Sequence, residues 1–206
     1  MIAALGLGTT ALAQDPNLSP ANPADVGRPA GLLGSPYTQF EYNYIDLDGW
    51  GPSHADGFGV TLNQPFWPNL DYHLGYDYAS AKFMGSRLRV HEAEFGLTMH
   101  TQYAWGKPFV MAAAGWQWQK AGGFSDDSFA FKVGTGVEFQ VAPAVALTPF
   151  VNFVRATSFD ASEVEWGVKA TYRFNESWSA TARAQYEAVE DASDSQEYSL
   201  GVNYHF

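Results

Sequence analysis

The chain has no cysteine, which excludes disulfides, thiolate metal ligands and cysteine nucleophiles. It also has no run of about 20 apolar residues, the length that a membrane-spanning helix needs. Charged residues make up only 16% of its 206 residues, whereas a usual soluble domain has roughly 25%. A helical membrane protein and a disulfide scaffold are therefore both excluded. What the chain does have is aromatic side chains, which also make up 16% of it.

Positive charge is scarce. The 11 Lys and Arg residues stand against 22 Asp and Glu, which gives a net charge of −11. A nucleic-acid-binding surface needs a basic face for phosphate contacts, so we predict no nucleic-acid partner. The same balance argues against charge-driven binding to an anionic membrane surface. We also predict no cofactor.

The N-terminal part of the chain divides into two segments that precede any regular pattern. Residues 1–13 are apolar and end in Ala11-Leu12-Ala13, a small-x-small cleavage site, so we interpret them as the remnant of a signal peptide without its positive start. Residues 14–36 are rich in Pro, Asn, Ala and Gly and have no hydrophobic period. We interpret them as a periplasmic linker.

From Tyr37 to Phe206 one unit recurs, which is about ten residues of alternating polarity followed by a turn. Strands that cross a membrane need about 9–11 residues, and bacterial barrels use even strand counts. The pattern therefore predicts an all-β fold over residues 37–206: a closed, antiparallel, up-and-down transmembrane β-barrel of about ten strands, with eight as the alternative. The expected strands are 37–45, 56–64, 70–79, 87–99, 108–119, 128–141, 145–155, 163–174, 178–189 and 197–206.

The two faces of these strands differ in a way that predicts which one faces outward. The apolar faces carry large aromatic residues, whereas the polar faces are small, Gly-rich and bear charges of both signs. Small residues fit a crowded lumen and large apolar ones fit lipid, so we expect the apolar faces outside. In segment 145–155 either face could point outward, because Leu147 and Val151 on one face are matched by Phe150 and Val154 on the other.

The last strand carries the most specific motif of the chain. From Tyr198 every second residue is apolar, and the chain ends on an aromatic residue. Residues 199–206 resemble the closing-strand signal of bacterial outer-membrane β-barrel proteins. The resemblance implies an outer-membrane location in a Gram-negative cell, assembly by the barrel assembly machinery, and contact with membrane lipid and lipopolysaccharide. The residues that carry the assembly signal are Ser199, Gly201, Tyr204 and Phe206. We expect this strand to pair with Tyr37–Ile45, which would remove both sheet edges.

The connections between strands alternate in character. If the N-terminus is periplasmic, the extracellular connections are longer and acidic, and they comprise Asp46–Ala55, Ser80–Ser86, Lys120–Asp127, Ala156–Ser162 and Glu190–Gln196. The periplasmic ones are shorter, with Pro, Asn and Gly as turn residues. Three of these hold a tryptophan, a residue that membrane interfaces favour. We therefore predict interface aromatics at Trp67, Trp105 and Trp178.

The inward faces carry the charges that could serve a function. A barrel of eight strands is just filled by its side chains, so a lumen of about ten strands is expected to be largely filled by salt bridges and hydrogen bonds. The alternative is a narrow path for small cations, because carboxylates outnumber cationic groups. The predicted lumen charges are Glu92, Glu94, Lys132, Glu138, Glu165, Lys169, Arg173, Arg183 and Glu187.

Catalytic and metal-binding patterns are weak. Omptin proteases pair Asp-x-Asp with Asp-x-His at one rim, but here Asp46-Leu47-Asp48 and Asp71-Tyr72-His73 fall at opposite ends of the strands, beyond the reach of one water. No His-x-Ser pair supports a lipid A deacylase. The acidic loops lack a full set of calcium ligands. We therefore predict no catalytic, cofactor or metal residues. The leading hypothesis is a non-enzymatic structural or surface barrel, followed by a cation-preferring channel and then a membrane enzyme.

Overall fold

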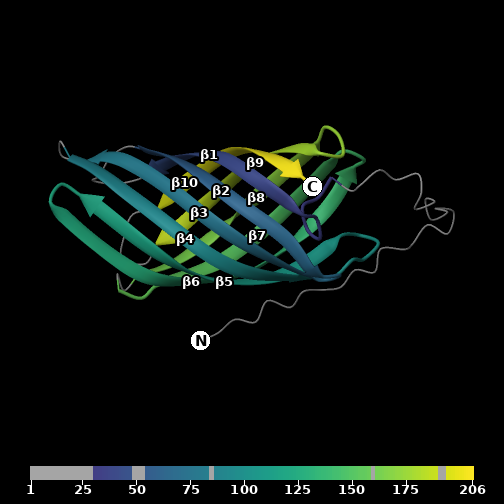
Figure 1. The fold of residues 1–206 in the computed structure, drawn as a ribbon, viewed down its shortest axis with the longest axis horizontal. Coiled ribbons are helices and arrows are strands. Elements are labelled where there is room, and N and C mark those ends of the chain that lie inside the picture. The colour runs from purple at the N-terminus through teal and green to yellow at the C-terminus, as the bar shows by residue number, and fades with distance from the viewer. Residues whose placement is uncertain (1–29, 48–53, 84–85, 159–160, 190–193) are drawn as a thin grey trace, which may run out of the picture.

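The computed structural model describes residues 30–47, 54–83, 86–158, 161–189 and 194–206. Ten strands form one closed antiparallel barrel, in which each strand pairs with its neighbours in the sequence (Figure 1). No helix formed by the described residues is long and apolar enough to cross a membrane. The strands are β1 (Tyr37–Leu47), β2 (His54–Trp67), β3 (Leu70–Phe83), β4 (Ser86–His100), β5 (Lys107–Ala121), β6 (Phe124–Ala142), β7 (Val145–Ala156), β8 (Ala161–Arg173), β9 (Trp178–Val189) and β10 (Ser195–His205).

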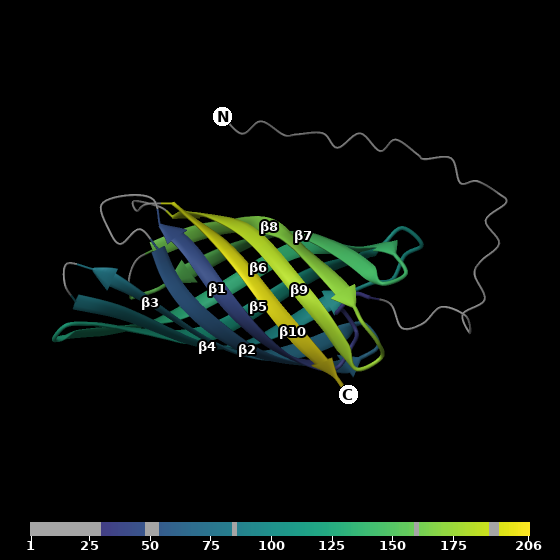
Figure 2. The same ribbon diagram turned by 90° about the horizontal axis from the view of Figure 1, so that it is seen from above.

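The closed ten-stranded barrel confirms the fold predicted from the alternation. β1 and β10 close it, in a register that runs from Tyr37 opposite His205 to Leu47 opposite Ser195. Figure 2 shows these two strands side by side. Because every strand has two partners, the sheet has no edge that could pair with another chain.

Two of the expected extracellular connections are shorter than predicted. β3 extends to Phe83 and β4 begins at Ser86. Only residues 122–123 separate β5 from β6. The expected loops Ser80–Ser86 and Lys120–Asp127 are therefore mostly strand. The physical reason is that backbone pairing continues after the apolar alternation ends, and Gly122, at φ 59°, permits a tight turn.

The exterior of the barrel is apolar and the interior polar, as predicted. On β10, Leu200 is 68% exposed and Tyr204 is 43% exposed, whereas Asn203 between them is completely buried. The register also decides the open question in segment 145–155: Leu147 and Val151 are exposed, and Thr148 is buried. Phe150 consequently faces the lumen, where it lines a cavity.

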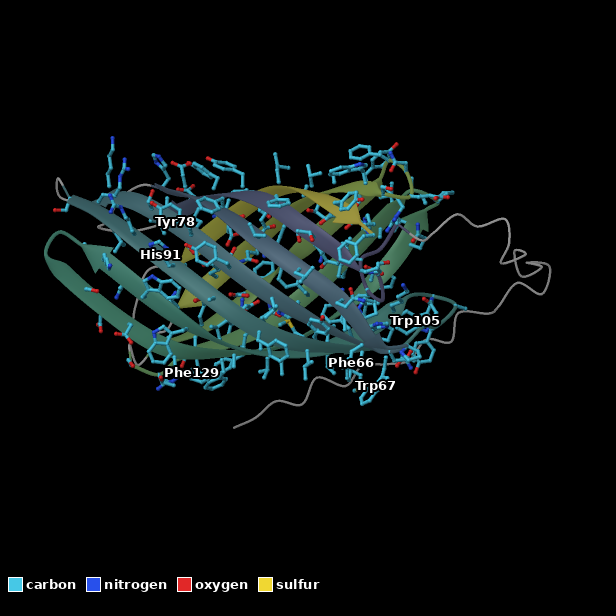
Figure 3. All side chains as sticks on the ribbon, viewed as in Figure 1. Phe66, Trp67, Tyr78, His91, Trp105 and Phe129 are labelled. Atoms are coloured by element: carbon cyan, nitrogen blue, oxygen red, sulfur yellow. The ribbon has the colours of Figure 1, made fainter. Side chains whose placement is uncertain are left out.

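The two ends of the barrel differ. One end holds the start of β1 and the end of β10. The segment that precedes β1 is expected on the periplasmic side, so we call this the periplasmic end and the other the extracellular end. Figure 3 shows Phe66, Trp67 and Trp105 together near the periplasmic end, with Tyr78 and His91 toward the other. Aromatic residues at two levels match the two interfaces of a membrane.

Candidate functional site

The lumen is the candidate site, because the alternation of side chains along the strands directs most of the charged residues in the middle of the barrel wall inward. All nine predicted lumen charges lie on inward-facing register positions. Several of them surround a cavity of about 220 Å³. The lumen-facing positions are Glu92, Glu94, Lys132, Glu138, Glu165, Lys169, Arg173, Arg183 and Glu187.

Arg183 of β9 is the centre of one ion network. Its Nη2 lies 2.6 Å from Oε1 of Glu197 and 3.3 Å from Oε1 of Glu41, so it joins β9 to β10 and β1. Its Nε donates to the hydroxyl of Ser199 at 3.3 Å. Gln185 donates to the other oxygen of Glu197 at 3.2 Å. The closing strands of the barrel are therefore tied together from inside by one guanidinium.

A second network lies across the lumen on the other strands. Lys132 of β6 reaches Glu165 of β8 at 3.4 Å, and Asn152 of β7 donates to the same carboxylate at 2.9 Å. On β3 and β4, His73 and Glu94 lie 3.1 Å apart. The contacts of the two networks give Glu41, Glu94, Glu165 and Glu197 a donor each, as a low-dielectric interior requires.

Residues 30–35 enter the periplasmic end of the lumen, and we call them the mouth segment. Leu32 is 2% exposed and Ala30 is completely buried. Ser35 N donates to Leu32 O at 3.1 Å and Gly34 has φ 76°, so residues 32–35 make a tight turn with glycine at its third position. This segment belongs to the expected linker, and nothing in the sequence pattern predicted that it packs inside the barrel.

Side chains of the barrel wall hold the backbone of the mouth segment. The amides of Leu32 and Leu33 donate to Oε2 of Glu138 at 2.7 and 3.3 Å, and Gly34 N donates to Oδ2 of Asp71 at 2.8 Å. Lys107 Nζ donates to Leu33 O at 3.0 Å. Two further contacts come from Gln140, which accepts from Ala30 N, and from Asn63, which donates to Ser35 O.

Gly31 of the mouth segment lies close to the side chain of Glu138. A Cβ built at this position would lie 1.9 Å from Oε1 of Glu138. Only glycine lets the backbone approach the carboxylate so closely, because any side chain would overlap it. The mouth segment is thus fitted to its site in both shape and hydrogen bonding.

The residues considered for catalysis and metal binding do not meet. Asp71 lies at the periplasmic end, with Oδ1 3.5 Å from Nε2 of buried His100, whereas Asp46 is near the extracellular end of β1. Asp48 lies outside the described residues. Glu163, Glu165 and Glu187 bring carboxylate oxygens within 4.8 Å of one another. Glu165 already binds Lys132, and Glu187 accepts from Ser195 and Gln185, so two of the three carboxylates have partners within the chain.

The remaining predicted residues lie on the outside or on the closing strand. Trp67, Trp105 and Trp178 are 64%, 58% and 45% exposed near the periplasmic end. Tyr204 contacts Trp178 with ring centroids 5.0 Å apart, and Phe206 is 53% exposed. Ser199 and Gly201 face the lumen, where a Cβ on Gly201 would lie 2.7 Å from Oγ1 of Thr181. Sequence reasoning did not place Lys107 and His100 in the lumen, because their positions next to turns gave no signal for it.

No family model matches the chain, and no curated protein matches its sequence. Solved structures do match it. An outer membrane channel from Pseudomonas putida F1 aligns with a TM-score of 0.54 and 10% identity, covering 91% of this chain and 100% of that one. The translocator domain of the autotransporter NalP from Neisseria meningitidis aligns with a TM-score of 0.51 and 10% identity, covering 85% and 89%. The beta domain of the Bordetella autotransporter BrkA aligns with a TM-score of 0.51 and 12% identity, covering 84% and 100%.

At these identities the likeness shows the fold alone, which is that of the outer-membrane β-barrels. The exterior of this chain adds its own observation, because apolar and aromatic side chains are exposed around a polar lumen. A closed barrel of this kind suits a lipid surround, since lipid-facing and lumen-facing residues alternate along each strand. The chain therefore has the fold of the outer-membrane β-barrels, with an exterior that suits lipid.

Proposed function

We propose that the protein is a non-enzymatic barrel whose lumen is closed at the periplasmic end by its own mouth segment. It would serve the outer membrane as a structural or surface protein. The observation that carries this proposal is the set of hydrogen bonds from Leu32, Leu33 and Gly34 to Glu138 and Asp71. We expect a segment held by buried carboxylates at the mouth to interrupt a straight water path along the axis.

The size and the interior of the barrel support the same conclusion. Barrels of about eight strands are filled by side chains, whereas open porin channels have 16–18 strands. In this ten-stranded barrel, Lys132 of β6 reaches Glu165 on β8 and Arg183 of β9 reaches Glu41 on β1, so each contact passes over the strand between them. The separation of Asp46 from the buried pair Asp71 and His100 supports a non-enzymatic role, because a general base must lie within hydrogen-bond reach of its proton.

A second candidate function is a narrow cation path, and the cavity of about 220 Å³ in the lumen favours it. Carboxylates outnumber cationic side chains in its lining. The acidic residues are Glu41, Asp71, Glu94, Glu138 and Glu165, and the cationic ones are Lys132, Lys169 and Arg183. A lumen with this charge balance selects cations when it conducts.

Planar bilayer recording of a Gly31→Val variant tests the closure. The added side chain overlaps the Glu138 carboxylate and should displace the mouth segment while leaving the barrel wall unchanged. We expect silent bilayers for the wild type and small conductance steps for the variant, with a reversal potential that favours K⁺ over Cl⁻. Adding Glu94→Gln to the variant should weaken that preference.

Gly123→Val is the matched control, because a Cβ at Gly123 meets nothing within 4 Å. It should be as silent as the wild type. Wild-type steps equal to those of Gly31→Val would mean that the mouth segment closes nothing and would favour the channel. A silent Gly31→Val variant that still shows heat-modifiable gel mobility would mean that the lumen is blocked without the segment.

A further inference from the structure

Four of the five outward-facing cations of the described strands lie in one region of the exterior. Four cationic residues lie on outward register positions at the extracellular end of three adjacent strands, and all four are exposed. We call them the basic patch: Lys82 of β3, Arg87 and Arg89 of β4, and Lys120 of β5. The other outward-facing cation of the described strands, Arg155 of β7, donates to Ser162 at 2.6 Å.

The patch consists of like charges placed directly against each other. Lys82 is the cross-strand partner of Arg87, and Lys120 is the cross-strand partner of Arg89. Like charges directly opposite each other destabilise a sheet. Among the ion pairs of the described residues, none involves any of the four. Within the described chain, no carboxylate therefore forms an ion pair with the patch.

The nearest exterior carboxylates are already engaged or are displaced along the register. Asp56 on β2 lies opposite Ser80, accepts from the hydroxyl of Tyr42 and is 3.9 Å from Nε2 of His54. Asp127 on β6 lies opposite Trp118, one outward position below Lys120. Neither carboxylate forms an ion pair with the patch.

An aromatic cluster lies immediately below the patch on the same face. His91, two residues after Arg89, stacks on Trp118 with ring centroids 5.4 Å apart. Its Nδ1 lies 2.8 Å from the hydroxyl of Tyr76, and Tyr78 packs against it edge to face at 5.0 Å. Figure 3 labels Tyr78 and His91 at this level. Such aromatic belts mark the membrane interface, so cations one outward position further, about 7 Å along the strand, stand at the level of lipid headgroups.

We propose that the basic patch binds the phosphate groups of a lipid in the outer leaflet, with its acyl chains on the exterior of β3–β5. Guanidinium groups bind phosphate oxygens in pairs, and lysine adds point charges, so two cation pairs suit a headgroup with more than one phosphate. The surface below the aromatic cluster continues as exposed Phe95, Leu97 and Met99. An amphipathic ligand contacts both surfaces, whereas a soluble anion contacts only the patch. This inference concerns the exterior and stands independently of the closed lumen.

The local charge also qualifies the expectation drawn from the net charge of −11, which argued against attraction to an anionic membrane. Most of the carboxylates of the barrel wall that carry that charge face the lumen or lie on other strands. A lipid headgroup next to β4 meets the field of the patch, because charges further than about 10 Å away are screened at ordinary ionic strength.

Lipid retention by the protein in nanodiscs tests the proposal. The discs contain phosphatidylcholine with a small fraction of diphosphorylated lipid A, and parallel discs contain its dephosphorylated form. Native mass spectrometry counts the lipids that stay on the released barrel. A cation near a membrane surface contributes about a fivefold gain in affinity. Replacing Lys82, Arg87, Arg89 and Lys120 together by Gln should therefore lower retention of the phosphorylated lipid at least tenfold, and raised salt should lower it in the wild type.

The controls separate charge from folding and lipid from soluble phosphate. Arg87→Lys/Arg89→Lys keeps the charge and should keep most of the retention. Lys82→Gln/Arg87→Gln removes a single cation pair. It replaces the fourfold variant in the test if that variant does not fold, as judged by the loss of heat-modifiable mobility on gels. Equal retention by wild type and neutralised variants would overturn the proposal, and so would equal retention of the dephosphorylated lipid. Displacement of the lipid by millimolar inorganic phosphate would assign the patch to a soluble anion instead.

Discussion

The cations of the lumen and the cations of the exterior have opposite surroundings. In the lumen, Arg183 lies between Glu41 and Glu197, and Lys132 lies against Glu165. On the exterior, Lys82 and Lys120 lie opposite Arg87 and Arg89. Arg183 and Lys132 are thus neutralised by carboxylates of the chain inside the wall, whereas the four exterior cations are left next to each other.

The difference follows from what each side of the wall contacts. A charge enclosed in the lumen loses its hydration, so it is tolerated only with a partner from the same chain. A charge at the headgroup level keeps contact with water and lipid phosphates. The lumen therefore stabilises the barrel internally, whereas the basic patch depends on the membrane. Substitutions on the two sides should consequently change stability in opposite directions.

Arg183→Gln should have the largest effect on stability. It leaves Glu41 and Glu197, two inward carboxylates on the closing strands, without their shared cation. Breaking a buried ion pair by removing one partner costs about 3–5 kcal/mol, and we expect a loss of the free energy of unfolding in that range. Urea unfolding in phosphatidylcholine vesicles, followed by tryptophan fluorescence, measures it.

Arg183→Lys is the matched control, because it retains the charge and loses only the fork geometry of the guanidinium. It should recover most of the lost free energy. If Arg183→Gln unfolded at the wild-type urea concentration, the contacts within the lumen would contribute nothing and the contrast between the two sides would disappear.

The barrel itself was predictable because the two faces of each strand lie in different environments. Lipid and lumen act on alternate residues, so strands such as Tyr198–Phe206 have a period that can be read directly, and the same parity placed Lys132 and Arg183 inside. Segment 145–155 was ambiguous because both of its faces are apolar. Phe150 lines a cavity inside the lumen, and only pairing with β6 and β8 fixes its register.

The mouth segment and the basic patch were not predictable, since both depend on contacts between distant parts of the chain. Leu32 and Glu138 are 106 positions apart, and residues 30–35 show no period. Lys82 and Lys120 were expected in loops, which hid their cross-strand pairing with β4. Net charge gives the balance of a chain but not the side of the wall on which each charge lies.

Lys132→Gln should have an intermediate effect. It removes the cation from one carboxylate, Glu165, rather than from two, and Asn152 continues to donate to that carboxylate at 2.9 Å. Leaving a buried charged acceptor partly satisfied costs about 1–3 kcal/mol, less than the loss expected for Arg183→Gln. The same unfolding experiment measures it. A loss as large as that of Arg183→Gln would mean that Asn152 does not compensate.

Lys120→Gln should have the smallest effect and the opposite sign. Lys120 faces outward on β5 while Lys132 faces inward on β6, so the two substitutions remove the same charge on opposite sides of the wall. In phosphatidylcholine vesicles, removal of the like-charge pair with Arg89 should stabilise the barrel by about 0.2–1 kcal/mol. In vesicles that contain diphosphorylated lipid A, the gain should vanish or reverse, because the lipid phosphate already offsets the repulsion. Destabilisation by Lys120→Gln in both lipids would place its partner within the protein, and the two sides of the wall would then follow the same rule.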